Sequence, residues 1–470
     1  GRSTPALIAG ALMAMAPAHF ILSRMAVDYL FPAPFALGWC LLFLKALDRR
    51  SGAALFAATS VLGLGCYSYI GAVALMPLFV GVTVLLLWRE GWAWRSIAVA
   101  LAGFAWPLIP AAWFITMHPQ MLTSTLGRYG IAANQLDAFQ RLRETLTPWF
   151  ISDRANLYFS FFSPGYLFVT GSGGLVGSTR TAGVFLACSL PLMLIGVRAT
   201  LLRYSPSSTL LVAGMLLPPV AGSVVDEPFS IGRAITMVPF GILLAVLGIE
   251  QLRGRTPPAV LAPALKVCGA IATGIGLLYL IYRAASGDLT PGGLVVAALG
   301  LAAIGLAYGV GRARSFSPVV AALLLGCAWQ YSSFALDYFG DYRARSAFWF
   351  NGNLKGAVTR IVAEIDREGT TPEVLLDQGI NRIDWYWRFH LAELGRSELE
   401  PLLRVVERDE MRTRAVPAGA LYLFPSIDDT LRAVVESRGM ALVATITDPG
   451  DDESGQAPGE RPSYVLFRAR

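Results

Sequence analysis

The sequence predicts a polytopic α-helical membrane protein that ends in a soluble α/β domain. Of its 470 residues, 55% are hydrophobic and only 15% are charged, whereas soluble domains have about 25% charged residues. Apolar stretches of about 20 residues, the length that crosses a bilayer, follow one another up to residue 335. A backbone in lipid must satisfy its own hydrogen bonds, so these stretches are expected to be helices.

The predicted membrane domain, residues 1–335, has about eleven spans. They are expected at 5–23, 28–46, 52–70, 71–88, 96–117, 181–201, 207–225, 231–251, 260–282, 293–311 and 316–335. One connection, 118–180, is much longer than the others. The chain opens on Gly1 rather than Met, which we interpret as a start inside a longer gene product.

Alternate connections between the predicted spans are rich in basic residues. They contain Lys45, Arg49 and Arg50; Arg89 and Arg95; Arg198 and Arg203; Arg253 and Arg255; and Arg312 and Arg314. The positive-inside rule places this set in the cytoplasm. It also explains the net charge of +6 without a nucleic-acid partner. The excess of arginine over lysine is typical of a GC-rich bacterial genome, so we predict a bacterial cytoplasmic (inner) membrane protein with its C-terminal domain in the periplasm.

Charged residues gather at the expected outer face, first at the junction SRMAVD. Arg24 and Asp28 lie there, between the first two spans. A charge at the membrane interface is costly and is a candidate functional group by default. The alternative is a local ion pair at a helix end, because the two residues are four apart.

The long outer connection contributes three further candidates. His118, Arg128 and Tyr129 are placed to contact an anionic substrate. For His118, which precedes a proline, a structural role as a helix cap is the alternative. The aromatic residues of this connection are typical of the headgroup level of a membrane.

Another candidate cation follows two acids in the sequence VVDEPFSIGRAITMVP. Asp226 and Glu227 precede a span, and Arg233 lies about one turn inside it. A guanidinium at this depth is suited to bidentate binding of a lipid phosphate. Snorkelling toward the headgroups is the alternative. Arg180, at the start of another span, is a weaker candidate of the same kind.

The tail, 336–470, alternates predicted helices and strands, which is typical of a small α/β domain. Helices are expected at 353–368, 382–395 and 428–439, and strands at 372–379, 420–425, 440–448 and 463–470. Asp377, Asp384, Trp385, Tyr386 and Trp387 are candidates for a binding surface, with packing in the core and at its rim as the alternative.

Several catalytic motifs are absent from the sequence. There is no Walker motif, HExxH, GxSxG or Cys/His cluster, and the chain has only three His. The sequence therefore names no metal ligands and no cofactor, although a divalent metal is left open.

Four segments together resemble a known family. They are SRMAVDYLFPAPFALGWCLLF, YSYIGAVALMPLFV, DEPFSIGRAITMVP and YFGDY, arranged around a long outer loop. They resemble GT-C glycosyltransferases of the dolichyl-phosphate-mannose-protein mannosyltransferase and aminoarabinose-transferase type (family 39 type). The resemblance implies about thirteen spans, so the first two spans and the principal catalytic acid would precede this sequence.

The resemblance also implies an activity at the outer face. Such enzymes transfer a sugar from a polyprenyl-phosphate donor to a protein, lipid or glycan acceptor. Asp28 matches the second acid of the family, and Arg24 and Arg233 match basic positions that meet the carrier phosphate. A transporter or flippase of lipid-linked sugars and a non-catalytic membrane scaffold are the alternative functions.

Overall fold

The fold is known from a computed structural model of the chain. It describes residues 3–25, 27–120, 147–223, 229–253, 255, 261–285, 301, 304–305, 316–380, 382–407, 410, 416–425, 429–447 and 462–470. The chain divides into two compact units, Gly1–Leu336 and Asp337–Arg470. The described part is mostly helical with one small sheet, as the sequence predicted.

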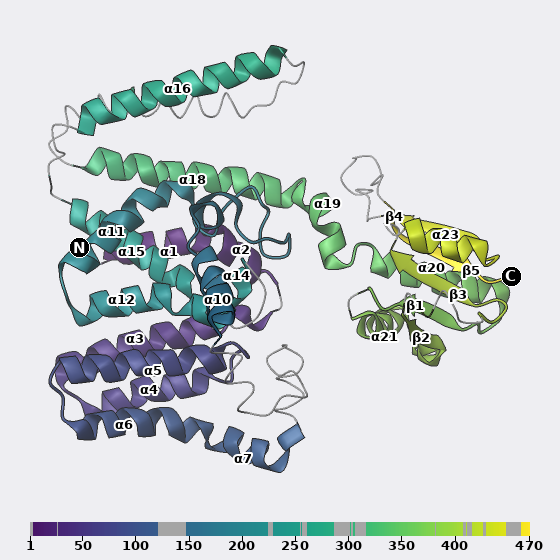
Figure 1. Cartoon of the computed structure of the whole chain (residues 1–470), viewed down its shortest axis with the longest axis horizontal. Helices are drawn as coiled ribbons and strands as arrows, with labels where there is room; N and C mark the ends of the chain where they lie inside the picture. Colours follow the sequence, from purple (N-terminus) through teal and green to yellow (C-terminus); the bar gives the residue numbers. More distant parts are fainter. Residues whose placement is uncertain are drawn as a thin grey trace. The chain divides into compact units, whose positions relative to one another are not determined.

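The first unit is a bundle of apolar helices (Figure 1). Its described α-helices are α1 (Ser3–Met15), α2 (Pro17–Ser23), α3 (Pro32–Arg49), α4 (Gly52–Gly65), α5 (Ala72–Arg89), α6 (Trp94–Ala105), α7 (Ile109–Met117), α10 (Pro148–Ser160), α11 (Leu190–Leu202), α12 (Pro206–Leu216), α13 (Pro218–Ser223), α14 (Ile231–Ala234), α15 (Met237–Leu252), α16 (Leu261–Ala285) and α18 (Ser317–Phe339). Shorter helical turns are η1 (Asp28–Leu30), η2 (Trp106–Leu108), η3 (Tyr166–Thr170) and η4 (Ala187–Ser189).

Two apolar cores hold this bundle together. In one, α3 packs on α4 and α4 on α6, around the buried rings of Trp39, Phe43 and Phe79. The indole of Trp39 donates a 3.0 Å hydrogen bond to Thr83 Oγ1, so its buried N–H is satisfied. Helix α12 connects the two cores, because it contacts both α3 and α15.

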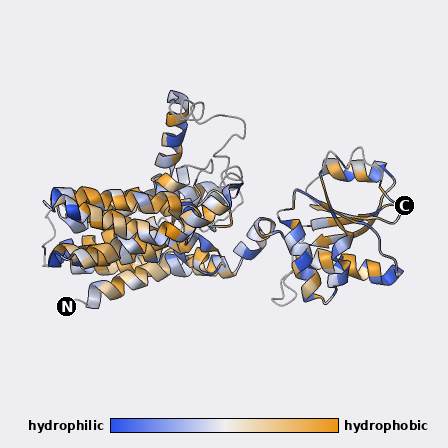
Figure 2. Cartoon of the chain, turned by 90° about the horizontal axis from the view of Figure 1, so that it is seen from below, coloured by the Kyte–Doolittle hydropathy of each residue, from blue (hydrophilic) through white to orange (hydrophobic). Residues whose placement is uncertain are grey.

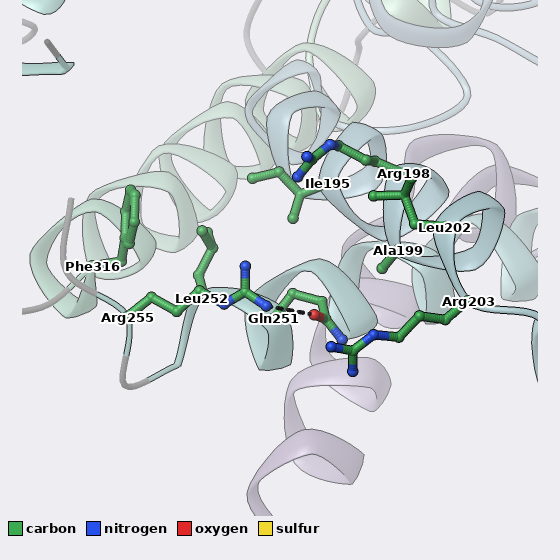
Figure 3. Close-up of a pocket in the computed structure, with 9 residues that line it drawn as sticks. All are labelled: Ile195, Arg198, Ala199, Leu202, Arg203, Gln251, Leu252, Arg255 and Phe316. Atoms are coloured by element: carbon green, nitrogen blue, oxygen red, sulfur yellow. Dashed lines mark hydrogen bonds between the residues drawn. The ribbon is translucent and has the colours of Figure 1, made fainter. Parts of the chain in front are cut away.

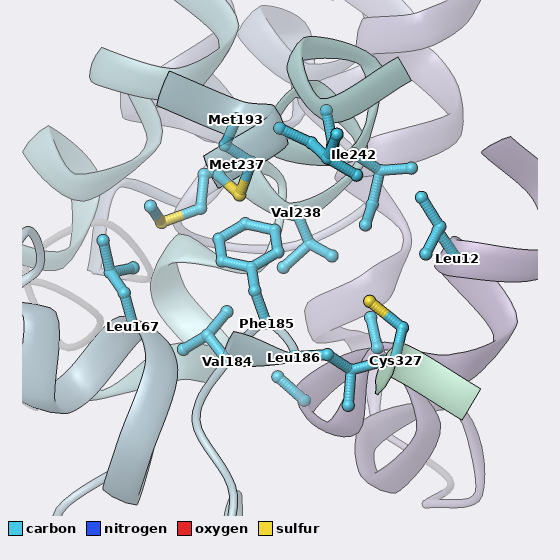
Figure 4. Packing of buried hydrophobic residues seen from close by; sticks show 14 of the residues in the cluster. Leu12, Leu167, Val184, Phe185, Leu186, Met193, Met237, Val238, Ile242 and Cys327 are labelled. Atoms are coloured by element: carbon cyan, nitrogen blue, oxygen red, sulfur yellow. The ribbon is translucent and has the colours of Figure 1, made fainter. Parts of the chain in front are cut away.

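The second core lies where α11 and α15 pack together with α1. Figure 4 shows Phe185 at its centre, with Met193, Met237 and Val238 around the ring. A Cβ on Gly241 would lie 2.4 Å from Phe185 Cζ, so the ring requires a glycine at this position. This core supports the turns that carry the candidate site.

Four described helices are long and apolar enough to cross a membrane: Asp28–Arg49, Ala72–Arg89, Trp94–Met117 and Ser317–Phe339. The pair α1 and α2 forms a fifth candidate, bent by 68°. Shorter apolar helices cover Gly52–Gly65, Ala187–Leu202, Met237–Leu252 and Gly269–Tyr282. By length and composition the first unit is that of a multi-pass membrane protein. Figure 2 shows apolar residues along its helices and hydrophilic residues toward their ends.

The count of eleven spans stays a prediction. The expected span 293–311 lies almost wholly outside the described residues. Two expected spans are interrupted: the stretch 207–225 divides before Pro218, and the stretch 231–251 divides between α14 and α15. Proline lacks an N–H and clashes with the preceding turn, which explains the interruption at Pro218 and the bend before Pro17.

Several basic connections meet at one end of the bundle, which we call the basic end. Arg50 Nη2 donates to Glu90 O at 3.4 Å, and Tyr204 Oη donates to Glu90 Oε1 at 3.0 Å. The guanidinium of Arg89 lies 3.8 Å from the centroid of the Tyr204 ring. The connections that follow α3, α5 and α11 therefore lie side by side, at the left in Figure 1.

The second unit is an α/β domain with a five-stranded sheet in the order β2-β1-β3-β5-β4. Strand β1 pairs in parallel with β2 and β3, whereas β5 pairs antiparallel with β3 and β4. The strands are β1 (Val374–Asp377), β2 (Leu403–Val406), β3 (Leu421–Pro425), β4 (Ala441–Thr447) and β5 (Pro462–Arg468). The helices are α19 (Tyr342–Ser346), η5 (Ala347–Phe350), α20 (Leu354–Glu368), α21 (Ile383–Glu393), η6 (Ser397–Leu402) and α23 (Asp429–Ser437).

Candidate functional site

Segments far apart in the sequence meet at the end of the first unit that carries α2, η1, α10 and α14 (Figure 1). A Cβ on Gly232 would lie 2.6 Å from Tyr29 Cδ2, and one on Gly177 would lie 2.8 Å from Ile231 Cγ2. These approaches bring η1, the loop 171–186 and α14 into direct contact. We call these three segments, together with α2, α10 and α13, the site cluster.

Asp28 and Arg24 lie on the first segment of the chain that enters the site cluster. Helix α2 ends at Ser23, Arg24 follows as its C-cap residue, and Asp28 begins η1. Both side chains are exposed. The Arg24 guanidinium lies 5.3 Å from the centroid of the Phe20 ring, which holds the cation beside an aromatic face. Arg24 and Asp28 together place a cation and a carboxylate on one short connection.

Arg233 lies on the single turn α14, beside η1. Its neighbours Ile231, Gly232 and Ala234 are buried, while Arg233 itself is half-buried. Helix α14 and η1 approach with Cα separations within 8 Å. The fold thus brings the segment of Arg233 near that of Asp28, although the two residues are far apart in the sequence.

Arg180 lies at the tip of the loop 171–186. Its backbone has φ +61°, and its N–H donates to Ser178 Oγ at 2.9 Å. Ser178 Oγ in turn donates to Thr170 O at 2.7 Å, which closes the loop, and Gly171 provides a positive φ of +68° for the turn. The exposed Arg180 side chain is therefore carried by a loop whose base packs on α14 through Gly177.

Arg154 is a cation of the site cluster that the sequence did not single out. It lies on α10, half-buried, and its Nη1 donates to Ser223 O at 3.3 Å. Asp153 Oδ2 lies 3.6 Å from Arg154 Nη2, and the guanidinium lies 5.0 Å from the Phe150 ring centroid. The signal in the sequence was an arginine inside the aromatic stretch PWFISDRANLYF.

His118 stands apart from the site cluster. It ends α7, which Figure 1 shows beyond α6, on the side of the bundle away from α2. Its N–H donates to Phe114 O at 2.9 Å, and its ring centroid lies 4.7 Å from that of Phe114. These contacts fit the alternative role of a helix cap.

Four candidates lie outside the residues that the structure describes. Arg128 and Tyr129 belong to the segment 121–146, and Asp226 and Glu227 to the segment 224–228. Of the residues that flank the second segment, Ser223 ends α13 in the site cluster, and the Phe229 ring lies 5.7 Å from that of Tyr166.

The described residues contain no group of three or more His, Cys, Asp or Glu side chains placed to hold a metal ion. The described charged groups of the site cluster are guanidiniums and the carboxylates of Asp28 and Asp153. Guanidinium groups are suited to bind an anion, and a carboxylate is suited to accept a proton.

The aromatic candidates of the tail divide between core and surface. Trp387 is fully buried, and Asp377 is buried with Tyr422 Oη donating to its Oδ2 at 3.3 Å. Trp385 is 66% exposed, with the Arg382 guanidinium 5.6 Å from its ring centroid. Asp377 and Trp387 therefore serve the core of the second unit.

Comparisons with known proteins find a likeness among solved structures. No family model matches the sequence, and no curated protein matches it. Among solved structures, the chain is similar to the crystal structure of ArnT from Cupriavidus metallidurans in the apo state, with 15% sequence identity and a TM-score of 0.48. The match covers 98% of this chain and 78% of that chain.

Proposed function

We propose that this chain is a GT-C-type glycosyltransferase that moves a sugar from a polyprenyl-phosphate donor to an acceptor at the outer, periplasmic face of the membrane. The observation that carries the proposal is the packing of η1, with Asp28, against α14, with Arg233. A carboxylate and a guanidinium from distant segments thereby share one end of a membrane-embedded bundle.

The cations of the site cluster suit the leaving group of this reaction. When the bond between the anomeric carbon and the phosphate oxygen breaks, its electron pair leaves with the polyprenyl phosphate. Guanidinium groups placed at that oxygen stabilise the charge as it develops. We assign Arg233 and Arg24 to this role, with Arg180 and Arg154 as further cations within the same cluster.

The acid of the site cluster suits the acceptor. The acceptor oxygen or nitrogen attacks the anomeric carbon from the opposite face, and its proton passes to a carboxylate within hydrogen-bond reach. Asp28 is our candidate among the described residues, and Asp226 and Glu227 are candidates in the adjoining segment 224–228. Direct displacement of this kind inverts the anomeric carbon.

The test is sugar transfer in membranes that contain the full-length gene product. Radiolabelled sugars on polyprenyl-phosphate donors are supplied, and product is measured for the wild type, Asp28→Asn and Arg233→Gln. We expect each substitution to lower transfer by about 100-fold or more, the range for a lost acid–base group or charge stabiliser.

Two matched controls make the same chemical changes at the basic end. Asp48→Asn and Arg95→Gln alter exposed residues there, and both should stay within about twofold of the wild type, as surface substitutions usually do. Transfer that survives Asp28→Asn would overturn the residue assignment. A folded protein that transfers no sugar from any donor, or that only moves the donor across the membrane, would overturn the function.

A further inference from the structure

A cavity of about 480 Å³ opens at the basic end, between the ends of α11 and α15 and the start of α18. Figure 3 shows Arg198, Arg203 and Arg255 around it, with Gln251 between the last two. The volume falls within the range of about 300–1,000 Å³ that is typical of small-ligand sites. We call this cavity the basic pocket.

The rim of the basic pocket carries an excess of positive charge. Arg255 Nη2 donates to Gln251 Oε1 at 3.2 Å, and this amide separates Arg255 from Arg203. Within the described residues, no carboxylate forms an ion pair with Arg198, Arg203 or Arg255. The nearby Glu250 is directed to Arg253, at 3.5 Å. Guanidinium groups that form no ion pair with a described carboxylate are suited to bind a phosphate.

The wall of the basic pocket is apolar and held in place. Ile195 and Phe316 line it together with Leu252, which is only 8% exposed. Phe316 N donates to Arg255 O at 3.1 Å, so the backbone just before α18 is held beside that of the arginine. A cationic rim above an apolar wall matches an amphiphile, whereas a soluble anion would gain nothing from the wall.

We propose that the basic pocket binds the phosphate headgroup of an anionic phospholipid from the leaflet at this end of the bundle. The phosphodiester lies among Arg198, Arg203 and Arg255, and the first acyl carbons lie against Ile195 and Phe316. Basic pockets between membrane helices are suited to such headgroups. This site is separate from the site cluster and does not depend on the proposed sugar transfer.

The experiment measures lipid binding to the purified full chain in neutral detergent. Phosphatidylglycerol is titrated, bound lipid is counted by native mass spectrometry, and phosphatidylcholine serves as the reference whose zwitterionic headgroup has no net charge. Arg198→Gln/Arg203→Gln should bind phosphatidylglycerol about 25-fold more weakly, at about fivefold per arginine near an anionic lipid. The control Arg49→Gln/Arg95→Gln removes the same charge from exposed residues of the basic end outside the pocket and should stay within about twofold.

Three comparisons distinguish a lipid pocket from a diffuse basic surface and from a site for soluble anions. Equal losses in the two double variants would mean a diffuse basic surface and would overturn the proposal. Inorganic phosphate that competes as tightly as the lipid would overturn the lipid assignment. Phe316→Ala should weaken phosphatidylglycerol binding with the arginines intact, and unchanged binding in this variant would overturn the role of the apolar wall.

The thermal unfolding midpoint, measured with and without phosphatidylglycerol, checks both the folding of the variants and their lipid binding. Phosphatidylglycerol should raise the thermal unfolding midpoint of the wild type, because a ligand that binds the native state stabilises it. Arg198→Lys/Arg203→Lys keeps the charge but loses the planar fork, so its binding should lie between the wild type and the glutamine variant. An intermediate affinity, with an unchanged unfolding midpoint without lipid, supports bidentate binding. A lysine variant that binds as tightly as the wild type, or more tightly, contradicts it.

Discussion

Glu364 is a buried charge in the second unit, and its surroundings explain how it is tolerated. Its carboxylate is only 2% exposed and forms ion pairs with three arginines. The carboxylate oxygens lie 2.7 Å from Arg360 Nη2, 2.6 Å from Arg367 Nη2 and 3.5 Å from Arg468 Nη2. A buried carboxylate is costly unless it is paired and hydrogen-bonded. These arginines come from α20 and the end of β5, so the charge ties the helix to the sheet.

Replacing this carboxylate should weaken the second unit. Glu364→Gln keeps the shape but removes the charge that all three guanidinium groups share, although Arg367 and Arg468 keep Glu368 as a partner. Because hydrogen bonds to a charged carboxylate become hydrogen bonds to a neutral amide, we expect the free energy of unfolding to fall by about 2 kcal/mol. Urea dependence of hydrogen exchange at the β3 and β5 amides measures it in the full chain. Glu436→Gln is the control: its exposed pair with Arg432, at 3.2 Å, should be worth less than about 0.5 kcal/mol. Equal losses of unfolding free energy in Glu364→Gln and Glu436→Gln would contradict the role of the buried carboxylate.

Glu393 gives the second unit a dependence on pH. Hydrogen bonds from Lys355 and then His390, whose Nδ1 lies 3.2 Å from Glu393 Oε2, lower the pKa of this carboxyl. A lowered folded pKa stabilises the fold above the ordinary glutamate value of about 4.3, and that stability is lost as the pH falls through the folded pKa. Glu393→Gln should therefore lower the unfolding midpoint at neutral pH, and the difference should shrink as the pH falls through the lowered folded pKa. A difference that persists in acid would contradict this assignment.

At the residue scale, the cost of a charge near a membrane selected three residues that the fold brings to one end of the bundle, whereas their chemical roles stay predictions. Arg24, Asp28 and Arg233 were selected because charges near a membrane are costly, and the fold places all three in the site cluster. Arg154 was missed because its partner, the carbonyl of Ser223, belongs to a segment that no local pattern connects to α10.

Helices α11 and α15 cross at a contact that only glycines allow. A Cβ on Gly196 would lie 1.9 Å from Leu244 O, and one on Gly248 would lie 1.9 Å from Leu192 O. Small residues let membrane helices approach closely and pack through their backbones. The position of α15, and with it α14 and Arg233, depends on this crossing.

An added methyl group at the crossing should therefore push the helices apart. Gly248→Ala is expected to cost about 2 kcal/mol of stability through overpacking. Gly81→Ala is the matched control, because nothing lies within 4 Å of its added Cβ. In a helix interior that change should be neutral or stabilising by up to about 1 kcal/mol. Thermal unfolding in detergent measures both, and a neutral Gly248→Ala would contradict the close crossing.

At the element scale, hydropathy located the helices but not their interruptions. The run 231–251 is mostly apolar, yet it contains the turn α14, a break and α15. In the tail, periodicity predicted β1, β3, β4 and β5, whereas β2 was missed. Strand β2 has four residues at a sheet edge, and its central pair, Arg404 and Val405, is exposed, so it carries little hydrophobic signal.

At the scale of the whole molecule, the alternation of basic and non-basic connections predicts an orientation. Connections that the sequence grouped by charge do meet at the basic end, through Glu90 and Tyr204. The assignment of that end to the cytoplasm remains a prediction. It rests on the positive-inside rule, because the fold alone does not distinguish the two sides of a membrane.

Cysteine labelling tests this orientation. Trp385→Cys and Arg95→Cys place exposed thiols on the tail and at the basic end. A membrane-impermeant maleimide should label Trp385→Cys in intact cells. It should label Arg95→Cys only after the cells are lysed. The unsubstituted protein is the background control. The reverse pattern would contradict the predicted topology and move the site cluster to the cytoplasmic side.

The central claim is that the site cluster holds the phosphate of a polyprenyl-phosphate donor. The most direct measurement is photo-crosslinking of the full chain with a polyprenyl phosphate that carries a diazirine next to the phosphate, followed by peptide mapping. We predict crosslinks at η1 and α14, around Tyr29 and Gly232, that disappear in Arg233→Gln and persist in Arg198→Gln. Crosslinks confined to the basic pocket, or unchanged in Arg233→Gln, would contradict the account.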